Sequence, residues 1–521
     1  MPVQNPGVSS LFALHNLHKT QRTMSESIER LSSGKRINHA GDDAAGGAIA
    51  DRMTAQIKGL NMSVRNASDV LSMAQVAEGA LDESSKVLQR IRELAIQSAS
   101  DLMNGEERLY LQTEANQLIA ELDRVARDTT FNEIAVLDGT FADRRFQIGS
   151  KEREAATVSI GNLRTTAIGN NTVRTTATAG TSTDNNATAV SLGSADTIAD
   201  EDFTIHGLLG SKTIDVVAGS TARDVAEAIN IQFDQTGVSS TASTNMKIQA
   251  KGTAGSATLS IGLKGKNSTV RTVSAGITLA AAVGSSDLTG LSNAINAYSA
   301  ETGIVAVLSA DKATVYLTQD EGYNIALSDL DFADTTDDSR DLQVTGMDAR
   351  LFDADGSELL SGSAKTMTDT SHSSGSGKDA IVGGQVMMHS SHTFTATTTN
   401  TDGDLFESSP GSATLNKVSE LSLRTRSKAI DALKVVDKAL DKVHMERAKL
   451  GAVMSRMHQA IDNLTNVSAN TSSAKSRIVD ADMAAESAEL AKSQVLQQSA
   501  MAMIAQASRA QQSILTLLQG M

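Results

Sequence analysis

The sequence has no cysteine and no tryptophan, and its 521 residues include only three prolines and 3% aromatic residues. The lack of cysteine excludes disulfides, thiol catalysis and thiolate metal sites, and it suits a protein that works outside the cell without oxidative folding. Because ligand pockets depend on aromatic walls, the scarcity of large rings argues against deep, rigid pockets. These absences are atypical of an enzyme, and a chain of this length divides into several domains.

Long apolar runs are also missing. No segment is long enough to span a membrane, and the N-terminal stretch MPVQNPGVSSLFALHNLHKTQRT lacks the continuous apolar segment of about 7–15 residues that a secretory signal needs. If the protein is extracellular, we therefore expect it to leave the cell by another route.

The net charge of −15 is unevenly placed. Of the 46 Lys and Arg and the 61 Asp and Glu, residues 165–411 hold 13 and 29, and the rest of the chain holds 33 and 32. The middle therefore carries the excess negative charge, and we expect it to be the most solvated part. This sign of charge disfavours binding to DNA.

What the sequence does contain is a seven-residue apolar repeat at both ends. Near the C-terminus the spacing alternates between four and three through Leu496, Ala500, Met503, Ala507, Ala510, Ile514, Leu517 and Met521. Near the N-terminus it alternates between three and four, with one polar position, through Leu14, Leu17, Gln21, Met24, Ile28 and Leu31. Such a narrow seam suits packing of helix on helix, and a lone helix of this length is marginal in water. Each terminus therefore needs the other terminus, and then copies of the same chain, which predicts a polymer subunit.

Glutamines lie off the C-terminal seam, at Gln497, Gln498, Gln506, Gln511 and Gln512. They have two interpretations. They line a polar channel of the assembly, or they form a solvated helix face.

Helical periodicity resumes inside both terminal segments, after the interruptions RINHAGDDAAGG (36–47) and RIVDADMAAE (477–486). The pattern predicts a multidomain, mainly α fold, with a long helical bundle and a terminal coiled coil, and with an inserted variable outer region that is α+β and rich in β. The expected divisions are an N-terminal inner coiled-coil helix (1–35), a connector (36–46), the N-terminal part of an outer helical bundle with a β-hairpin (47–164), the variable surface-exposed region (165–411), the long C-terminal helix of the bundle (412–478), a second connector (479–485) and a C-terminal inner coiled-coil helix (486–521).

The variable region contains an internal repeat. AINIQFDQTGVSSTAS, from Ala228, and AINAYSAETGIVAVLS, from Ala294, match at an offset of 66 residues. In each, a short helix ending in Ala-Ile-Asn leads through Thr-Gly into an alternating strand, so we expect two small α+β modules of common origin. KIQAKGTAGSATLSI and ATVYLTQDEGYNIAL are expected to form the hairpin arms that follow, and residues 361–411 a returning β segment.

Several long segments together identify a family. IERLSSGKRINHAGDDAAGGAIADRMTAQIKGL, LQRIRELAIQSAS and TTFNEIAVLDGTF resemble the N-terminal region of bacterial flagellin, and SRIVDADMAAESAELAKSQVLQQSAMAMIAQAS with ILTLLQG resembles its C-terminal region. The resemblance covers about 1–160 and 412–521, in the correct order around a variable middle. Within that middle, GSTARDVAEAIN resembles the insertion module of many flagellins and hook-associated proteins.

The resemblance implies a structural subunit, without cofactor or catalysis, that polymerises into a hollow helical filament for swimming. The terminal helices form an inner coiled-coil tube, the adjoining helices form an outer tube, and the middle projects outward. Implied partners are further copies of the chain, cap and hook-associated proteins, and a type III secretion chaperone on the C-terminal helix. The expected assembly seam contains Leu14, Leu17, Met24, Ile28, Leu31, Leu496, Ala500, Met503, Ala507, Ile514 and Leu517. We expect both ends to be largely disordered in the free monomer and to fold on assembly.

The first connector departs from the family pattern. It carries Gly41 and the pair Gly46–Gly47, where relatives more often have a bulkier residue at one of these positions. Because glycine loosens a backbone, we expect a looser coupling of the inner and outer layers.

Four residues match the positions by which the flagellin-sensing Toll-like receptor recognises this family. They are Gln89, Arg90, Leu94 and Glu114, of which Arg90 and Leu94 are four apart and share a helix face. The alternative is that these residues make contacts between subunits in the filament. Both hold together if the receptor binds the free monomer.

Other polar clusters have weaker functional interpretations. His372, His389 and His392 suggest a metal, but polar residues of a Ser/Thr-rich loop are the preferred interpretation. The acidic stretches 329–341 and 353–358 resemble calcium loops without their ligand spacing, so a solvated face is preferred. Ser and Thr in the middle are possible acceptors of O-linked sugars.

Two further hypotheses compete with a filament subunit. A hook–filament junction protein has the same terminal helices but few copies. An adhesin displayed on the filament through the variable region, with its 66-residue repeats, belongs to another functional class.

Overall fold

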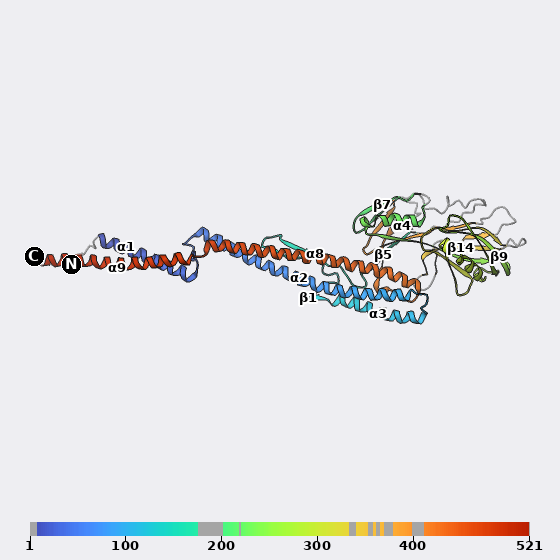
Figure 1. Ribbon diagram of the computed structural model, residues 1–521, viewed down its shortest axis with the longest axis horizontal. Helices are drawn as coiled ribbons and strands as arrows, with labels where there is room; N and C mark the ends of the chain where they lie inside the picture. Colours follow the sequence, from blue (N-terminus) through green and yellow to red (C-terminus); the bar gives the residue numbers. More distant parts are fainter. Residues whose placement is uncertain are drawn as a thin grey trace. The chain divides into compact units, whose positions relative to one another are not determined.

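Long helices occupy both ends of the chain, and strands dominate the sequence between them (Figure 1). The computed structural model describes residues 8–175, 202–217, 220–332, 340–352, 358–360, 365–368, 379–398 and 411–519. The contacts divide the chain into one unit of residues 1–78, 141–159 and 449–521 and a second unit of residues 79–140 and 160–448. The predicted fold class, long helices with an inserted β-rich region, is confirmed.

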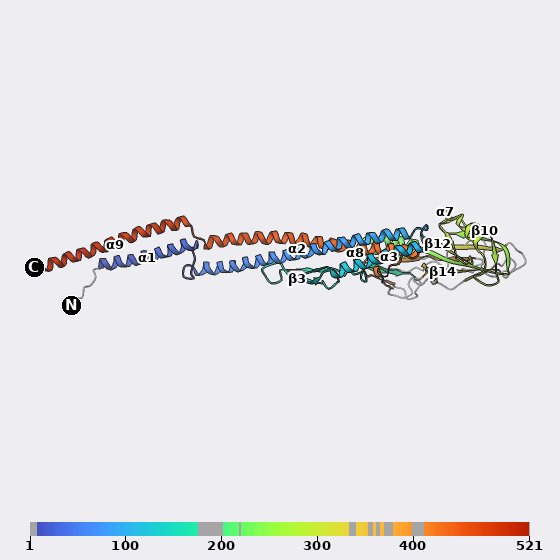
Figure 2. The same ribbon diagram turned by 90° about the horizontal axis from the view of Figure 1, so that it is seen from below.

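The first unit is built around the two chain ends. Helices α1 (Val8–Ser33) and α9 (Met483–Gln519) lie side by side in both views (Figures 1 and 2). The unit also contains the N-terminal part of α2 (Ala44–Ser98), the C-terminal part of α8 (Arg426–Val479), and a hairpin of β3 (Arg144–Gln147) and β4 (Ala155–Val158). Short connectors therefore separate α1 from α2 and α8 from α9.

The helical part of the second unit contains α3 (Gly105–Asp128) beside the remaining parts of α2 and α8. Helix α3 begins with a capping box, in which the Asn104 side chain accepts from the Glu107 N–H and the Glu107 carboxylate accepts from the Asn104 N–H. A short β1–β2 ribbon (Thr130–Phe131 and Ile134–Ala135) follows α3, and a 3₁₀ turn (Val418–Glu420) precedes α8. Apolar residues of all three helices form the buried face, among them Leu81, Leu88, Ile91, Leu94, Leu122, Val436 and Val443.

Three larger sheets make up the β-rich part within the described residues. The first follows the order β11 (Val305–Leu308), β12 (Thr314–Gln319), β8 (Ser239–Lys251), β18 (Gln385–Ser390), β5 (Gly169–Arg174) and β21 (Thr414–Lys417), and β14 (Asp341–Phe352) joins β8 to β15 (Glu358–Leu360) and β16 (Lys365–Thr368). The second has the order β10 (Arg271–Leu279), β9 (Gly255–Lys264), β13 (Ile325–Phe332) and β17 (Ala380–Val382). The third has the order β20 (Gly411–Ser412), β19 (Thr395–Thr398), β6 (Phe203–His206) and β7 (Ser211–Ile214).

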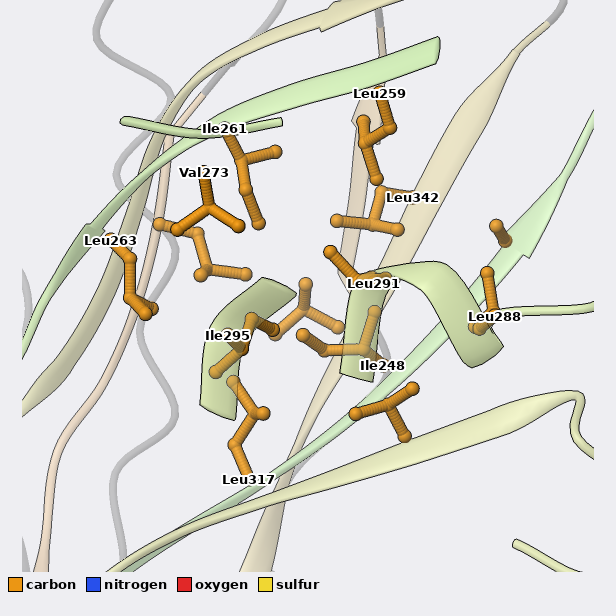
Figure 3. Packing of buried hydrophobic residues seen from close by; sticks show 14 of the residues in the cluster. Ile248, Leu259, Ile261, Leu263, Val273, Leu288, Leu291, Ile295, Leu317 and Leu342 are labelled. Atoms are coloured by element: carbon orange, nitrogen blue, oxygen red, sulfur yellow. The ribbon is translucent and has the colours of Figure 1, made fainter. Parts of the chain in front are cut away.

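A short helix closes each of two apolar cores in this region. Helix α6 (Thr289–Asn296) places Leu291 and Ile295 among side chains of the first two sheets, such as Ile248 and Ile261 (Figure 3). Helix α4 (Ala222–Ile231) places Val225 and Ile229 in the other core.

The two segments of the 66-residue repeat have the same local structure. In the first segment, Asn230 of α4 exchanges hydrogen bonds of 2.8 and 3.0 Å with the backbone of Ser240, in the strand that follows α5 (Phe233–Thr236). In the second segment, Asn296 of α6 makes two such bonds of 2.8 Å with the backbone of Ala306, in the strand that follows α7 (Ser299–Thr302). Gly237 and Gly303 both end their helix in the left-handed conformation, with φ of 72° and 71°.

The expected hairpin arms are wrong. The segment KIQAKGTAGSATLSI forms the end of β8 and the start of β9, which belong to different sheets. The segment ATVYLTQDEGYNIAL likewise divides between β12 and β13, which do not pair. A period-2 pattern predicts a strand but not the strand with which it pairs. Here each expected hairpin leaves one sheet and enters another across the apolar core. The described parts of residues 361–411 contain strands β16 to β19, in agreement with a returning β segment.

The expectation that Gly46 and Gly47 loosen the connector is also wrong. Both residues lie in the first turn of α2. The Asp43 carboxylate accepts a hydrogen bond of 2.8 Å from the Gly46 N–H, and a Cβ at Gly46 would collide with Asp43 Oδ2. Gly46 therefore makes room for a carboxylate that caps the helix.

Candidate functional site

The pair of terminal helices packs through a seam of half-buried residues. On α1 the more buried positions include Leu17, Met24, Ser27 and Leu31, and on α9 they include Leu490, Ser493, Gln497, Ala500 and Ile504. With the half-buried Thr20 of α1, these positions recur at spacings of three and four, as expected for helices that pack lengthwise. Ser27 and Ser493 are each only 2% exposed, so small polar side chains let the two backbones approach.

The same pair leaves many large apolar side chains exposed. We call this set the apolar stripe: Leu11, Phe12, Leu14 and Ile28 of α1, with Met483, Val495, Leu496, Met501 and Met503 of α9. Phe12 is 66% exposed and Met503 is 62% exposed. A monomeric protein rarely keeps so many apolar side chains in water on two neighbouring helices, so this surface is suited to contact with further helices.

The predicted assembly seam divides between these two surfaces. Leu17, Met24, Leu31 and Ala500 are half-buried in the α1–α9 pair, whereas Leu14, Ile28, Leu496 and Met503 belong to the exposed apolar stripe. The side chains of Ala507, Ile514 and Leu517 lie outside the described residues. The predicted heptad therefore overlaps each surface only in part, and Gln497, which was expected off the seam, lies on the half-buried side of α9.

Hydrogen bonds join the two connectors. The Arg36 N–H donates to the Val479 carbonyl at 2.6 Å, and the Ala481 N–H donates to the Gly34 carbonyl at 3.0 Å. Lys35 and Asp480 form the corresponding antiparallel bridge, and Arg30 of α1 pairs with Glu486 of α9 at 3.7 Å. This bridge cannot be predicted from the sequence, because a two-residue pairing of distant segments has no periodic signal.

The first connector has an internal anchor at Asp42. Its carboxylate accepts hydrogen bonds from the N–H groups of Asn38 and His39 at 2.8 and 2.9 Å. The bond from His39 and then the bond from Asn38 hold the pKa of Asp42 below its usual value. These two hydrogen bonds therefore hold residues 38–42 of the connector in an ordered turn.

The structure brings Arg90 and Glu114 together, from α2 and α3. The Arg90 guanidinium donates two hydrogen bonds to Glu114 Oε1, at 3.0 and 2.8 Å, and a third to Glu93 at 2.8 Å. Glu93 and Glu114 together raise the pKa of Arg90. Gln89, Arg90 and Glu114 are exposed, but Leu94 is only 1% exposed and packs inside the helical bundle. Leu94 therefore supports this surface from beneath and does not share the exposed face of Arg90.

Polar contacts hold the second unit's helices to each other and to the segment that follows α3. Arg92 of α2 pairs with Asp437 of α8 at 2.7 Å. The carboxylate of Asp123 in α3 accepts hydrogen bonds of 2.8 and 3.2 Å from the Arg164 guanidinium. It also accepts bonds from the Thr165 hydroxyl and N–H. The Arg164 hydrogen bond is the main cause that lowers the pKa of Asp123.

His389 departs from the loop expected from the sequence, whereas His392 lies in a bend after β18. His389 lies in strand β18, is only 4% exposed, and has hydrogen-bond partners on both ring nitrogens. His392 contacts the Ser391 hydroxyl at 3.1 Å, and His372 lies outside the described residues. Residues 333–339 and 353–357 of the acidic stretches also lie outside the described residues. In the part of the chain that the structure describes, no group of three or more acidic or histidine side chains has the arrangement of a metal site.

None of the helices in the described ranges is apolar over enough of its length to cross a membrane. Three family profiles match the chain. The bacterial flagellin N-terminal helical region matches residues 5–142, the bacterial flagellin C-terminal helical region matches residues 433–518, and the flagellin hook IN motif matches residues 202–254.

Curated relatives match over nearly the whole length. The chain is 35% identical to the B-type flagellin of Pseudomonas aeruginosa, with 99% of each chain covered. It is 31% identical to a flagellin of Salmonella typhimurium, again with 99% of each covered. It is 28% identical to flagellin B of Vibrio cholerae, with 99% of this chain and 98% of that protein covered.

Proposed function

Because the chain belongs to the bacterial flagellin family, and is a structural subunit of the flagellar filament that polymerises with copies of itself, we propose that burial of the apolar stripe on α1 and α9 drives its assembly. The carrying observation is the exposure of side chains such as Phe12, Leu496 and Met503 on the helix pair. In the filament these side chains pack against the terminal helices of neighbouring subunits. Each large apolar side chain that becomes buried contributes about 1.5–3 kcal/mol at most.

Assembly and folding of the ends are coupled in this proposal. The helix pair buries small polar residues such as Ser27 and Ser493 and leaves its larger apolar side chains in water. The pair alone therefore gains little from folding and, in the free monomer, is largely disordered. Neighbouring subunits supply the missing burial, so each end folds as it joins the filament.

The remaining parts take positions that follow from this arrangement. The terminal helices form the inner tube, α2, α3 and α8 form the outer tube, and residues 165–411 project outward with their excess acidic charge. Removal of residues 174–407 should therefore leave polymerisation intact. A structural role of this kind requires no catalytic group.

Export precedes assembly. The absence of disulfides permits passage as an unfolded chain through a flagellar type III channel. A chaperone that covers α9 would keep residues of the apolar stripe, such as Val495 and Met501, from associating before export. Hook-associated proteins neighbour the filament, and a cap complex receives each subunit at its tip.

We further infer that the exposed side chains of Gln89, Arg90 and Glu114 form the surface by which the Toll-like receptor for flagellin binds the monomer. Their exposure and the ion pair of Arg90 and Glu114 at 2.8 Å support this inference. Leu94 contributes by holding α2 in place, because its side chain is buried.

Seeded polymerisation followed by electron microscopy tests the assembly proposal. The full chain should extend seeds into long tubes, and a variant that lacks residues 1–33 and 486–521 should not. A sharper variant, Leu496→Ser with Met503→Ser, changes only side chains that are exposed in the helix pair. Its control is Leu208→Ser with Leu209→Ser, which changes two exposed leucines between β6 and β7.

The expected result is loss of tubes for the α9 variant and normal tubes for its control. Tubes from the Leu496→Ser and Met503→Ser variant at the normal critical concentration would reject the apolar stripe as the driving surface. Failure of the unaltered chain to extend seeds would favour a junction protein or a minor subunit that needs a partner.

A further inference from the structure

A cleft of about 510 Å³ lies inside the second unit. Its walls come from strands β5, β18 and β21, from α3, from the segment before α8 and from the first turns of α8. This volume lies within the range of sites that hold small ligands, about 300–1,000 Å³. The lining is rich in carboxamides, including Gln112, Asn116, Asn170 and Asn416.

Basic side chains outnumber acidic ones in the cleft. Arg174, Lys417, Arg424, Lys428 and Lys434 line it, against Glu420 and Asp431. Arg174 pairs with Asp348 at 3.2 Å, and Lys417 pairs with Glu420 at 2.9 Å. Arg424 and Lys434 form no ion pair with any described residue, so they supply positive charge that the described part of the protein leaves uncompensated. An anion is the ligand that such a balance favours.

Asn170 and His389 are hydrogen-bonded to each other in the wall of the cleft. The Asn170 amide nitrogen lies 2.9 Å from His389 Nδ1, and because an amide NH₂ can only donate, this ring nitrogen accepts. The other ring nitrogen then carries the proton and donates to the Thr241 hydroxyl at 3.0 Å. In this arrangement Asn170 Oδ1 is a buried acceptor with no partner among the described residues.

The environment of His389 agrees with this arrangement. Burial first, and then the charges of Lys434, Lys438 and Arg174, lower the pKa of His389 to about 3. The imidazole is therefore neutral and can accept from Asn170 at any physiological pH. Buried acceptors such as Asn170 Oδ1, which is in a residue only 2% exposed, usually have a donor.

We propose that this cleft binds a small acidic saccharide, one that carries a carboxylate or sulfate group on a polyhydroxylated ring. The acidic group lies beside Arg424 and Lys434, and the ring hydroxyls bond to polar side chains of the lining. The carboxamides of Asn116 and Asn416 and the hydroxyl of Ser422 supply the donors and acceptors that sugar hydroxyls need. A simple oxyanion meets the charge but offers no hydroxyl donor, and a neutral sugar meets the polar lining but not the charge.

Calorimetric titration of the purified full-length monomer tests the proposal. The probes are a sulfated heparin-derived disaccharide, an unsulfated disaccharide that contains a uronic acid, the neutral disaccharide N,N′-diacetylchitobiose, and inorganic sulfate. The variant is Arg424→Ala with Lys434→Ala. Its charge-matched control is Arg456→Ala with Lys475→Ala, two residues of α8 outside the cleft. Circular dichroism checks that both variants keep the helical content of the unaltered chain.

We expect saturable binding of at least one acidic disaccharide, which the Arg424 and Lys434 substitutions weaken by about tenfold or more and the control leaves unchanged. The neutral disaccharide should bind at least about tenfold more weakly than the acidic one. Binding of sulfate as tight as that of the disaccharides would overturn the saccharide assignment. Equal weakening in the control, or no binding of either acidic disaccharide, would overturn the site. Because the monomer is titrated, these outcomes are independent of whether the chain polymerises.

Discussion

The Arg36 guanidinium donates a hydrogen bond of 2.6 Å to the carbonyl oxygen of Ile478, 442 positions further along the chain. The Arg36 N–H makes a second bond of 2.6 Å to the neighbouring Val479 carbonyl. One residue of the first connector is therefore fastened to the end of α8, where the last four helical carbonyls lack partners within the helix. The contact ties the start of α2 and the end of α8 to one point from which both terminal helices leave.

Substitution Arg36→Ala should loosen this point without touching the apolar stripe. It removes the side-chain bond to Ile478, a net loss of about 1 kcal/mol, and keeps the backbone bond to Val479. We expect filaments that still form but depolymerise at a temperature a few degrees lower, as followed by light scattering on heating. Arg52→Ala, an exposed arginine of α2, is the control. Equal melting of both variants would mean that the Arg36 side chain does not stabilise the filament.

Glycines of α2 should respond differently to the same substitution. At Gly46 a Cβ meets the Asp43 carboxylate, so Gly46→Ala displaces the cap, and this cost of about 1 kcal/mol cancels most of the gain that alanine gives a helix. At Gly79 nothing lies within 4 Å of a Cβ, so Gly79→Ala stabilises the helix by about 1 kcal/mol. Thermal unfolding of the two variants, followed by circular dichroism, checks the difference. A gain for Gly46→Ala as large as that for Gly79→Ala would contradict the capping role of Asp43.

Some features of this fold can be predicted from the sequence, and others depend on contacts between distant segments. Heptad spacing identified the terminal helices, because it is a local signal. Which part of the apolar seam faces α1 and which faces solvent depends on the axial rotation of two helices, which a repeat does not specify. The bridge between Lys35 and Asp480 and the crossing from β8 to β9 are contacts of distant segments, so they were missed or wrongly assigned.

The candidate sites show the same limit. Family motifs named Arg90 and Glu114, and the structure adds that their side chains pair, at 2.8 Å. The same motif includes Leu94, and its spacing of four from Arg90 predicts a shared helix face, but Leu94 is only 1% exposed. A spacing along one helix does not say which of its faces the rest of the bundle covers. His389 was assigned to a loop because Ser and Thr surround it in the sequence. Its position in a central strand depends on pairing with β5 and β8.

Acid should weaken the contact between α3 and the segment after it through Asp123. The pKa of Asp123 is held below 3.8 in the folded state, mainly by Arg164, so its contribution is complete above the unfolded pKa and is lost as the pH falls through the folded value. Asp123→Asn should therefore lower stability by about 1 kcal/mol at pH 7 and make progressively less difference below about pH 4.

Denaturant unfolding of Asp123→Asn and of the unaltered chain at pH 7, 5, 4 and 3 measures this change. Asp69→Asn, at an exposed position of α2, serves as the control. A difference between Asp123→Asn and the unaltered chain that stays constant down to pH 3 would contradict an ionised Asp123 as the source of the stability.

Exchange of the two charges separates receptor recognition from folding at Arg90. The variant Arg90→Glu with Glu114→Arg can re-form the ion pair between α2 and α3, so the fold should persist, but it presents the opposite charge at each position. If the receptor contacts these side chains, the monomer concentration for half-maximal signalling in receptor-expressing cells should rise by about a hundredfold, a size typical of a charged residue at the centre of an interface.

Leu94→Ala cannot serve this purpose, because loss of a side chain only 1% exposed costs about 2–5 kcal/mol of stability and would reduce signalling through unfolding. Arg124→Ala, which removes an exposed guanidinium paired with Glu121, controls for the loss of a charge elsewhere on α3. Unchanged signalling by the exchanged variant, together with normal unfolding, would reject Arg90 and Glu114 as receptor contacts and leave their ion pair as a structural link between two helices.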